Sequence, residues 1–394
     1  MWGPATPRRL LWALAGAGRL RPGKPRAAPR ACAAGSLRRW LGSFLQPLPY
    51  LDYEETMPWE PRSRLDPRRY ITNLKLAHTV APILMRGSKK NRPPIMECNP
   101  GPGILTELLL GYGSSVIVLE SEKVFIPHLE SLGNNKVKLD VVHCDFFKLD
   151  PKVCEIMKPP VLTSQTLFEN LGLTPVSWSE DVPLKIFGIL PIRYERKALW
   201  KLMYCLYACN SIYRYGRVEL DLIVSEREYQ KIKGSPRSPD NYQVLSVVCQ
   251  VACDIKLLHK EPCSSFSIYN QNGKVEKPKN KEILELIDQD MYLIRLIPRK
   301  NLFTENLTPI NFDIFFHMIR HCFGKPNASI LHHLRALSPI DAKIILKKMK
   351  LAESTKVNKM SPRDFKLLFE TVESMEGDSV YKWLYDNSMD DSLI

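Results

Sequence analysis

The segment 94–106, Pro-Ile-Met-Glu-Cys-Asn-Pro-Gly-Pro-Gly-Ile-Leu-Thr, constrains the fold of this chain more than any other. An apolar run leads to Glu97, a turn rich in proline and glycine follows, and residues 104–110 have the pattern of a helix start. A strand, a tight loop and a helix N-terminus in this order point backbone N–H groups at a ligand. Gly101 lets the backbone approach that ligand, and Asn99 tolerates a left-handed turn. The segment therefore predicts a nucleotide-type α/β unit.

The residues around this loop discriminate among nucleotide ligands. Thr106 stands where the dinucleotide fingerprint G-x-G-x-x-G requires its third glycine. Glu120 ends the next apolar run, nineteen residues after Gly101, and can accept hydrogen bonds from ribose hydroxyls. Asp145 ends a third such run and is placed to bind the exocyclic amine of an adenine. Together they predict S-adenosylmethionine as cofactor, while solvated strand ends are the alternative for both acids.

Positive charge is concentrated at the N-terminus. The net charge is +14, and residues 1–51 hold eight Arg, one Lys and no acid, which leaves 14 − 9 = +5 for the remainder. Such a composition is typical of a mitochondrial transit peptide, and a disordered arm that binds nucleic acid is the alternative. We therefore expect a mitochondrial matrix protein whose fold begins after a polar, proline-rich linker at 52–66.

The rest of the chain is expected to form two domains. Strand and helix patterns alternate over 95–150, as a parallel sheet requires, within an α/β domain expected at 67–300. The period becomes helical within the expected domain 301–394, which ends in an acidic tail. No apolar run approaches the roughly eighteen residues that a membrane span needs. Further elements are expected as a strand at 184–187, a helix at 195–210, a strand at 217–224, a helix at 226–233, a helix then a strand within 242–259, and a strand at 291–297.

Local sequence patterns give four further predictions. A first helix is expected at 70–85, and residues 151–183 are expected to be irregular. Ser338 and Ser361 are each followed by Pro and, three residues on, by Asp. In both segments the Ser would cap a helix, the Pro would occupy its first turn, and the Asp would meet its positive end.

Cysteine and histidine spacing gives no metal site. The ten cysteines include no C-x-x-C pair, so we expect buried reduced thiols. One region is crowded with potential ligands, but their spacing matches no familiar zinc module. These ligands are His317, His321, Cys322, His332 and His333.

Four segments, 97–106, 119–123, 143–150 and 242–247, resemble the rRNA adenine N6-dimethyltransferase family, and the resemblance extends over roughly residues 66–335. Within the family the chain is most similar to the mitochondrial transcription factor B proteins, in particular to the second of their two paralogous groups. The resemblance implies a class I S-adenosylmethionine-dependent methyltransferase domain, Rossmann-like, followed by a smaller all-helical C-terminal domain.

The resemblance also implies which residues form a cofactor pocket. Those residues are Ile71, Asn99, Gly101, Glu120 and Asp145. Ile71 takes the place of the Leu in the family's Gln-Asn-Phe-Leu motif, which reads Arg-Arg-Tyr-Ile in this chain. Two cations, Arg68 and Arg69, thus replace the polar pair of the family.

The methyl-transfer motif of the family, Gly-Asn-Leu-Pro-Tyr, is degenerate in this chain. It falls on Gly188, Ile189, Leu190, Pro191 and Ile192. In the family the Asn would orient the adenine amine and the aromatic residue would stack on the flipped base. Losing one such polar group lowers the rate by about 10²–10³, and losing the platform removes roughly 1–3 kcal/mol of base binding. We therefore expect methyl transfer to be weak at most.

Two other segments bear on nucleic-acid and partner binding. The family's basic Gln-Arg-Arg-Lys segment falls near residues 324–327, where Lys325 retains the charge. Lys325 is thus a candidate nucleic-acid contact, and a solvated loop is the alternative. The stretch 151–183 is longer than in the enzymes and is a candidate surface for a partner.

These residues are compatible with three functions to different degrees. The preferred one is a mitochondrial transcription initiation factor that assists the mitochondrial RNA polymerase in promoter melting and holds the opened DNA strand. Its partners would include promoter DNA and the high-mobility-group mitochondrial transcription factor, in the nucleoid. The second is an S-adenosylmethionine-dependent rRNA adenine N6,N6-dimethyltransferase that acts on small-subunit rRNA. The third, a nicotinamide-binding oxidoreductase, is opposed by Thr106 and by the lack of a hydride-transfer acid and base.

Overall fold

The computed structural model describes residues 68–86, 93–133, 138–150, 162–269, 289–375 and 382–383. The predicted transit peptide and linker, and nearly all of the predicted acidic tail, lie outside the described residues. No helix within these described ranges is long and apolar enough to cross a membrane.

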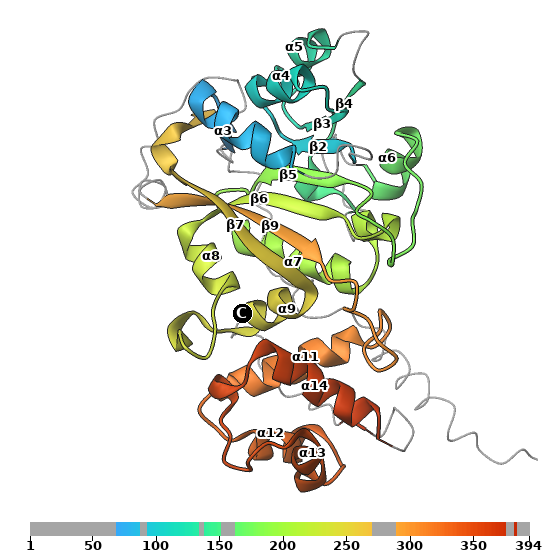
Figure 1. The fold of residues 1–394 in the computed structure, drawn as a ribbon, viewed down its shortest axis with the longest axis vertical. Coiled ribbons are helices and arrows are strands. Elements are labelled where there is room, and N and C mark those ends of the chain that lie inside the picture. The colour runs from blue at the N-terminus through green and yellow to red at the C-terminus, as the bar shows by residue number, and fades with distance from the viewer. Residues whose placement is uncertain are drawn as a thin grey trace, which may run out of the picture. The chain divides into compact units, whose positions relative to one another are not determined.

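A seven-stranded sheet with the order β4-β3-β2-β5-β6-β9-β7 forms the centre of the α/β region (Figure 1). The strands β2 to β6 are mutually parallel, as the sequence predicts, whereas β9 runs antiparallel to both β6 and β7. Every residue of β2, β3 and β6 is buried, which explains the nearly continuous apolar runs of β2 and β3. The strands are β2 Ile95–Cys98, β3 Val116–Glu120, β4 Leu139–His143, β5 Lys185–Ile189, β6 Glu219–Ser225, β7 Cys253–Pro262 and β9 Asp290–Pro298.

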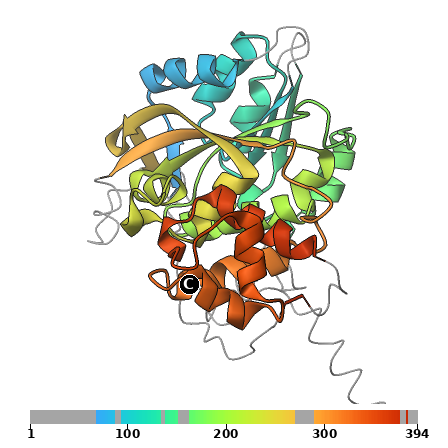
Figure 2. The same cartoon turned by 60° about the horizontal axis from the view of Figure 1, so that its bottom comes forward.

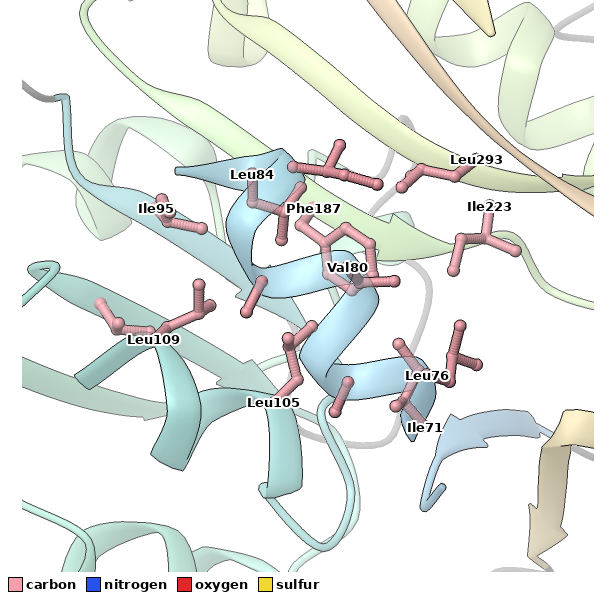
Figure 3. Packing of buried hydrophobic residues seen from close by; sticks show 14 of the residues in the cluster. Ile71, Leu76, Val80, Leu84, Ile95, Leu105, Leu109, Phe187, Ile223 and Leu293 are labelled. Carbon is pink, nitrogen blue, oxygen red and sulfur yellow. The ribbon is translucent and has the colours of Figure 1, made fainter. Parts of the chain in front are cut away.

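Helices cover both faces of this sheet, with α3 and α4 on one side and α7, α8 and α9 on the other (Figure 1). Figure 3 shows the core under α3, where Val80 and Leu84 meet Leu105 and Leu109 of α4 and Phe187 of β5. Burial of each such side chain contributes about 1.5–3 kcal/mol. The helices are α3 Leu74–Leu84, α4 Ile104–Gly111, α5 Ile126–Ser131, α6 Ser164–Asn170, α7 Glu195–Tyr207, α8 Glu226–Ile232 and α9 Val244–Ala252.

The prediction of a helix at 70–85 is wrong at its start. Strand β1 (Arg68–Ile71) pairs antiparallel with β8 (Phe266–Tyr269) in a separate two-stranded sheet. Helix α3 begins only at Leu74, where Asn73 accepts a hydrogen bond from the Lys75 N–H at 2.9 Å. The aromatic and β-branched residues of β1 favour a strand, and the Asn cap sets the helix boundary.

The stretch 151–183 is not wholly irregular. Residues 151–161 lie outside the described ranges, and α6 begins immediately after Thr163, whose hydroxyl accepts from the Thr166 N–H. Leu167 and Phe168 on this helix are fully buried. A capping Thr before two buried apolar residues is enough to start a short helix that the proline content of the stretch obscured.

The C-terminal region is helical from Phe312, as expected (Figure 2). Its helices are α11 Phe312–Gly324, α12 Ile330–Leu337, α13 Ala342–Met349 and α14 Pro362–Glu373. Helices α11 and α14 pack on α9, and the Tyr242 hydroxyl donates to the Met360 carbonyl at 2.7 Å. The predicted boundary after residue 300 falls between β9 and α11.

The two predicted Ser caps have different outcomes. Ser361 caps α14 and forms a capping box with Asp364, which confirms that prediction. Ser338 instead ends α12, and its hydroxyl donates to the Lys382 carbonyl at 2.6 Å. Asp341 caps α13 in its place by accepting from the Lys343 N–H at 2.9 Å, because the helix begins three residues later than expected.

Candidate cofactor and nucleic-acid site

The carboxyl ends of β2, β3 and β4 bring most of the predicted cofactor residues together. Asn99 follows β2, Glu120 ends β3 and Asp145 follows β4, and these strands are neighbours in the sheet. The Gly101 N–H donates to Glu120 Oε2 at 2.9 Å, and the Ser121 N–H donates to Asn99 Oδ1 at 3.2 Å. The edge of the sheet thus joins residues that are up to 46 positions apart, from Asn99 to Asp145.

The loop after β2 adopts the left-handed conformations that its sequence suggests. Asn99 has φ +51°, Gly101 has φ +63° and Gly103 has φ +77°. A Cβ atom on Gly101 would lie 2.4 Å from Cδ1 of Tyr70. The side of Gly101 that a side chain would occupy is therefore filled by the buried Tyr70 ring of β1.

A buried hydrogen bond between Thr106 and Glu97 joins α4 to β2 on either side of this loop. The Thr106 hydroxyl donates to Glu97 Oε2 at 2.7 Å, and both residues are buried. Burial raises the pKa of Glu97 to about 7, against the opposing effect of the Thr106 hydrogen bond. The sequence identified Thr106 only as a missing glycine, yet its hydroxyl holds the carboxylate at the end of β2.

Glu120 is fully buried, so the interpretation of this acid as a solvated strand end is wrong. Its carboxylate accepts from the backbone N–H groups of Gly101 and Glu122, at 2.9 and 2.7 Å. Desolvation raises the pKa of Glu120 to about 6, although the two amide hydrogen bonds favour the charged form. The position is chemically suited to accept hydrogen bonds from hydroxyl groups.

Asp145 is also buried, and it is held by cations. Arg68 Nη2 donates to Asp145 Oδ2 at 2.8 Å, and Lys148 Nζ lies 3.5 Å from the same oxygen. The Phe147 N–H donates to the other carboxylate oxygen at 3.2 Å. Burial alone would raise the pKa of Asp145, but the charges of Arg68 and Lys148 outweigh it and lower the pKa. The sequence did not identify Arg68 as the partner of this acid.

The other cation of β1 has a structural partner. Arg69 Nη1 donates to Glu195 Oε1 at 3.0 Å, and the Ser225 hydroxyl and N–H both donate to Glu195 Oε2. This buried cluster ties β1 to the start of α7 and to the end of β6. Ile71, the remaining predicted pocket residue, is buried in the core beneath α3 (Figure 3).

The degenerate transfer motif begins with the last two residues of β5, Gly188 and Ile189, and continues into the loop at the same edge of the sheet. Leu190 and Ile192 are buried, whereas Ile189 and Pro191 are only partly covered. Ile192 exposes only 4% of its surface and offers no platform for a base. Gly188 lies close to β2, because a Cβ atom there would be 3.2 Å from Cβ of Cys98.

Lys325 is exposed in the loop between α11 and α12. Backbone hydrogen bonds join this loop to a later one: the Asn358 N–H donates to the Pro326 carbonyl at 2.9 Å, and the Val357 N–H to the Ala328 carbonyl at 3.2 Å. The later loop carries the exposed cations Lys356 and Lys359. The paired loops therefore present three lysines, of which the sequence predicts Lys325 alone as a nucleic-acid contact.

Other features of the described residues fall outside this site. A cavity of about 380 Å³ lies beside β4, α5 and α6 and includes none of the predicted cofactor residues. Within the described ranges, no group of three or more His, Cys, Asp or Glu side chains could hold a metal ion. His333 from the histidine-rich region is buried, and its Nε2 lies 3.1 Å from the Lys325 carbonyl oxygen.

The sheet order, the glycine turn after β2 and the acids at the ends of β3 and β4 define a Rossmann-like methyltransferase of class I. A family model described as ribosomal RNA adenine dimethylase matches residues 69–374. The chain therefore belongs to the ribosomal RNA adenine dimethylase family. This assignment confirms the predicted fold class and rules against the oxidoreductase alternative.

Two mammalian relatives support the same assignment. The human protein "Dimethyladenosine transferase 2, mitochondrial" is 50% identical over 99% of this chain and 100% of its own length. The rat protein of the same name is 52% identical over 90% of this chain and 89% of its own length. Among solved structures, a dimethyladenosine transferase from Plasmodium falciparum has a TM-score of 0.48 and 16% identity, and covers 76% of this chain and 95% of its own.

S-adenosylmethionine is the cofactor of this family, and this chain has residues of the chemical types that would bind it. Asn99 and Gly101 form the turn that would face it, and buried Glu120 and Asp145 are the acids that would hold its ribose and adenine. In this structure both acids already accept hydrogen bonds from the chain itself, Glu120 from the Gly101 N–H and Asp145 from Arg68. A bound cofactor would compete with the Arg68 guanidinium for Asp145.

Proposed function

We propose that this chain is a mitochondrial transcription initiation factor that assists the mitochondrial RNA polymerase in promoter melting and holds the opened DNA strand. The observation that carries the proposal is the chemistry of the transfer motif. Hydrocarbon side chains, Ile189 and Ile192, stand where the family has an amide and an aromatic ring, and Ile192 is buried. A site without groups to orient an adenine amine is poorly suited to methyl transfer.

Strand binding requires less of the scaffold than methyl transfer does. Phosphate neutralisation supplies most of the affinity for a nucleic-acid strand and depends on exposed cations. Such cations remain at Arg193, beside the transfer motif, and at Lys325, Lys356 and Lys359 in the helical region. The methyltransferase fold's capacity to accept an extruded base would thus be reused for melted DNA.

A mitochondrial location is supported from two directions. The human and rat relatives are mitochondrial proteins by name, and residues 1–51 have the composition of a transit peptide. In the matrix nucleoid the partners would be the single-subunit RNA polymerase, promoter DNA and the high-mobility-group transcription factor.

The test is a promoter-opening assay with purified mitochondrial RNA polymerase and the high-mobility-group factor. A 2-aminopurine base near the start site reports strand separation through its rise in fluorescence. We expect opening to require this chain and to saturate near one chain per polymerase. Equal opening with and without the chain would overturn the proposal.

The second candidate function is dimethylation of adenine in the small-subunit rRNA of the mitochondrion. It is favoured by the buried acids Glu120 and Asp145 and by the names of the relatives. When bound, S-adenosylmethionine would supply an electrophilic methyl group, while Glu120 would hold the ribose. Labelled methyl groups should then enter an rRNA hairpin, and Glu120→Ala or Asp145→Ala should abolish the labelling. No labelling at saturating cofactor would reject this function.

A further inference from the structure

Tyr194 is an exposed aromatic residue directly beyond the transfer motif. It precedes α7 at the carboxyl edge of the sheet, and 44% of its surface is exposed. The position that should carry the stacking ring, Ile192, lies two residues earlier and is buried. The loop after β5 therefore still presents a ring to solvent, but from a different position.

The surroundings of this ring are positively charged. Lys197 Nζ lies 5.7 Å from the centroid of the Tyr194 ring, and Arg193 is exposed beside it. Glu195, the acid in this segment, is buried and bonded to Arg69 and Ser225. The Glu195 carboxylate is therefore not available to repel a phosphate at the surface. An exposed ring flanked by cations can stack on a base while the cations contact its phosphates.

The other aromatic residues of α7 are engaged elsewhere. Trp200 packs edge-on against Phe316 at 6.2 Å, and Tyr204 packs against Phe312 at 5.1 Å, both from α11. Tyr207 is fully buried. Their contacts belong to the packing between α7 and the helical region, whereas Tyr194 is exposed.

We propose that the Tyr194 ring is the platform on which an unpaired base of the opened DNA strand stacks, with Arg193 and Lys197 contacting the phosphates on either side. The inference rests on the proposed function and names one contact through which the strand is held. Stacking tolerates any base because every base has a π-face, so this contact would hold a strand without reading its sequence.

Tyr112 provides a matched control. It is 48% exposed, and it ends α4, the helix that runs from the carboxyl edge back to the amino edge of the parallel strands. The two tyrosines are thus equally accessible but lie at opposite ends of the same sheet. Removing either ring should leave the fold intact, which equal melting temperatures of the variants and the wild type would verify.

The experiment measures equilibrium binding of the full chain to promoter duplex and to the same duplex with a preformed bubble. The bubble contains 2-aminopurine, whose fluorescence falls when a ring stacks on it. We expect Tyr194→Ala to weaken bubble binding about tenfold and to abolish the fluorescence change. Tyr194→Phe should retain both, Tyr112→Ala should match the wild type, and duplex binding should not change.

Each other outcome has a distinct meaning. If the wild type prefers the bubble and Tyr194→Ala binds it equally well, the stacking platform is wrong while the proposed function stands. If the wild type shows no preference for the bubble over the duplex, the proposed function fails and the platform with it. Binding to a small-subunit rRNA hairpin is measured in parallel, and a loss for Tyr194→Ala that is confined to this hairpin would overturn the assignment to DNA.

Discussion

The Arg68 guanidinium donates a hydrogen bond to Asp145 across 2.8 Å, and so strand β1 satisfies the carboxylate that would hold a cofactor's adenine. The side chains of Arg68 and Asp145 are 15% and 4% exposed, so solvent screens the pair only weakly. The motif of the family has an uncharged Gln at the position of Arg68. In this chain, an adenine amine that donates to Asp145 Oδ2 must compete with a charged donor.

Replacing Arg68 should therefore strengthen cofactor binding. We expect Arg68→Gln to raise the affinity for S-adenosylmethionine about tenfold, since a charge-assisted hydrogen bond no longer has to be broken. Calorimetric titration measures the change directly. Lys138→Gln is the matched control, because it removes one charge from an exposed pair with Asp140 on β4. An affinity for Arg68→Gln at or below that of the wild type would show that β1 does not compete.

Glu97 should make stability depend on pH. Its folded pKa of about 7 lies above the ordinary value of 4.5, so the folded state favours the protonated form. The free energy of unfolding should then fall as pH rises from about 4.5 to about 7, by at most ~3 kcal/mol. Glu97→Gln should flatten this part of the profile. Urea denaturation at several pH values measures the free energy of unfolding. The same pH dependence in Glu97→Gln and in the wild type would contradict the burial of an ionisable carboxylate at this position.

Thr106 provides a second measurement on the same pair. Its hydroxyl donates to Glu97, so Thr106→Val leaves a buried carboxylate without that donor. We expect a loss of about 1–3 kcal/mol above pH 7, where Glu97 is charged, and a smaller loss at pH 5. Equal losses at both pH values would indicate a packing effect instead of a hydrogen bond.

Gly101 should tolerate no side chain. Its Cβ would meet the Tyr70 ring at 2.4 Å, and its φ of +63° is unfavourable for other residues. Gly113 also has a positive φ, +76°, but a Cβ there meets open space. We expect Gly113→Ala to cost about 1 kcal/mol and Gly101→Ala to cost roughly 1–3 kcal/mol more, measured by chemical denaturation. Equal costs would mean that the Tyr70 ring moves away freely.

The paired loops of the helical region should contribute to affinity without sequence preference. Changing Lys325, Lys356 and Lys359 to Gln should weaken single-strand binding uniformly and reduce the slope of log K against log salt by about two. The matched control changes three exposed lysines that already face carboxylates. These are Lys138, Lys260 and Lys300, with Asp140, Asp290 and Asp181. If the two triple variants weaken binding equally, the loops contribute only through the net charge of the protein and form no specific contact with the strand.

The strand, loop and helix at 94–111 could be predicted from the sequence, because the glycines, Asn99 and the acids at strand ends form a pattern within a short stretch of the chain. The sequence could not reveal the ion pair of Arg68 with Asp145, since the partners are 77 residues apart and meet only through the tertiary fold. Tyr70 is predicted to lie in a helix but belongs to strand β1, because a short apolar run fits the periodicity of a helix and of a strand equally well. The prediction of Ser338 as a helix start is wrong, because a Ser-Pro pair can also follow the end of a helix, as it does after α12.

The central claim is that strand capture by this chain needs no methyl chemistry. The most direct measurement follows promoter opening by the mitochondrial RNA polymerase with the full chain, with and without S-adenosylmethionine, and counts labelled methyl groups on an rRNA hairpin with the same preparation. We predict opening that requires the chain and is unchanged by the cofactor, with labelling at background. Opening that proceeds without the chain, together with stoichiometric labelling of the hairpin, would contradict the account.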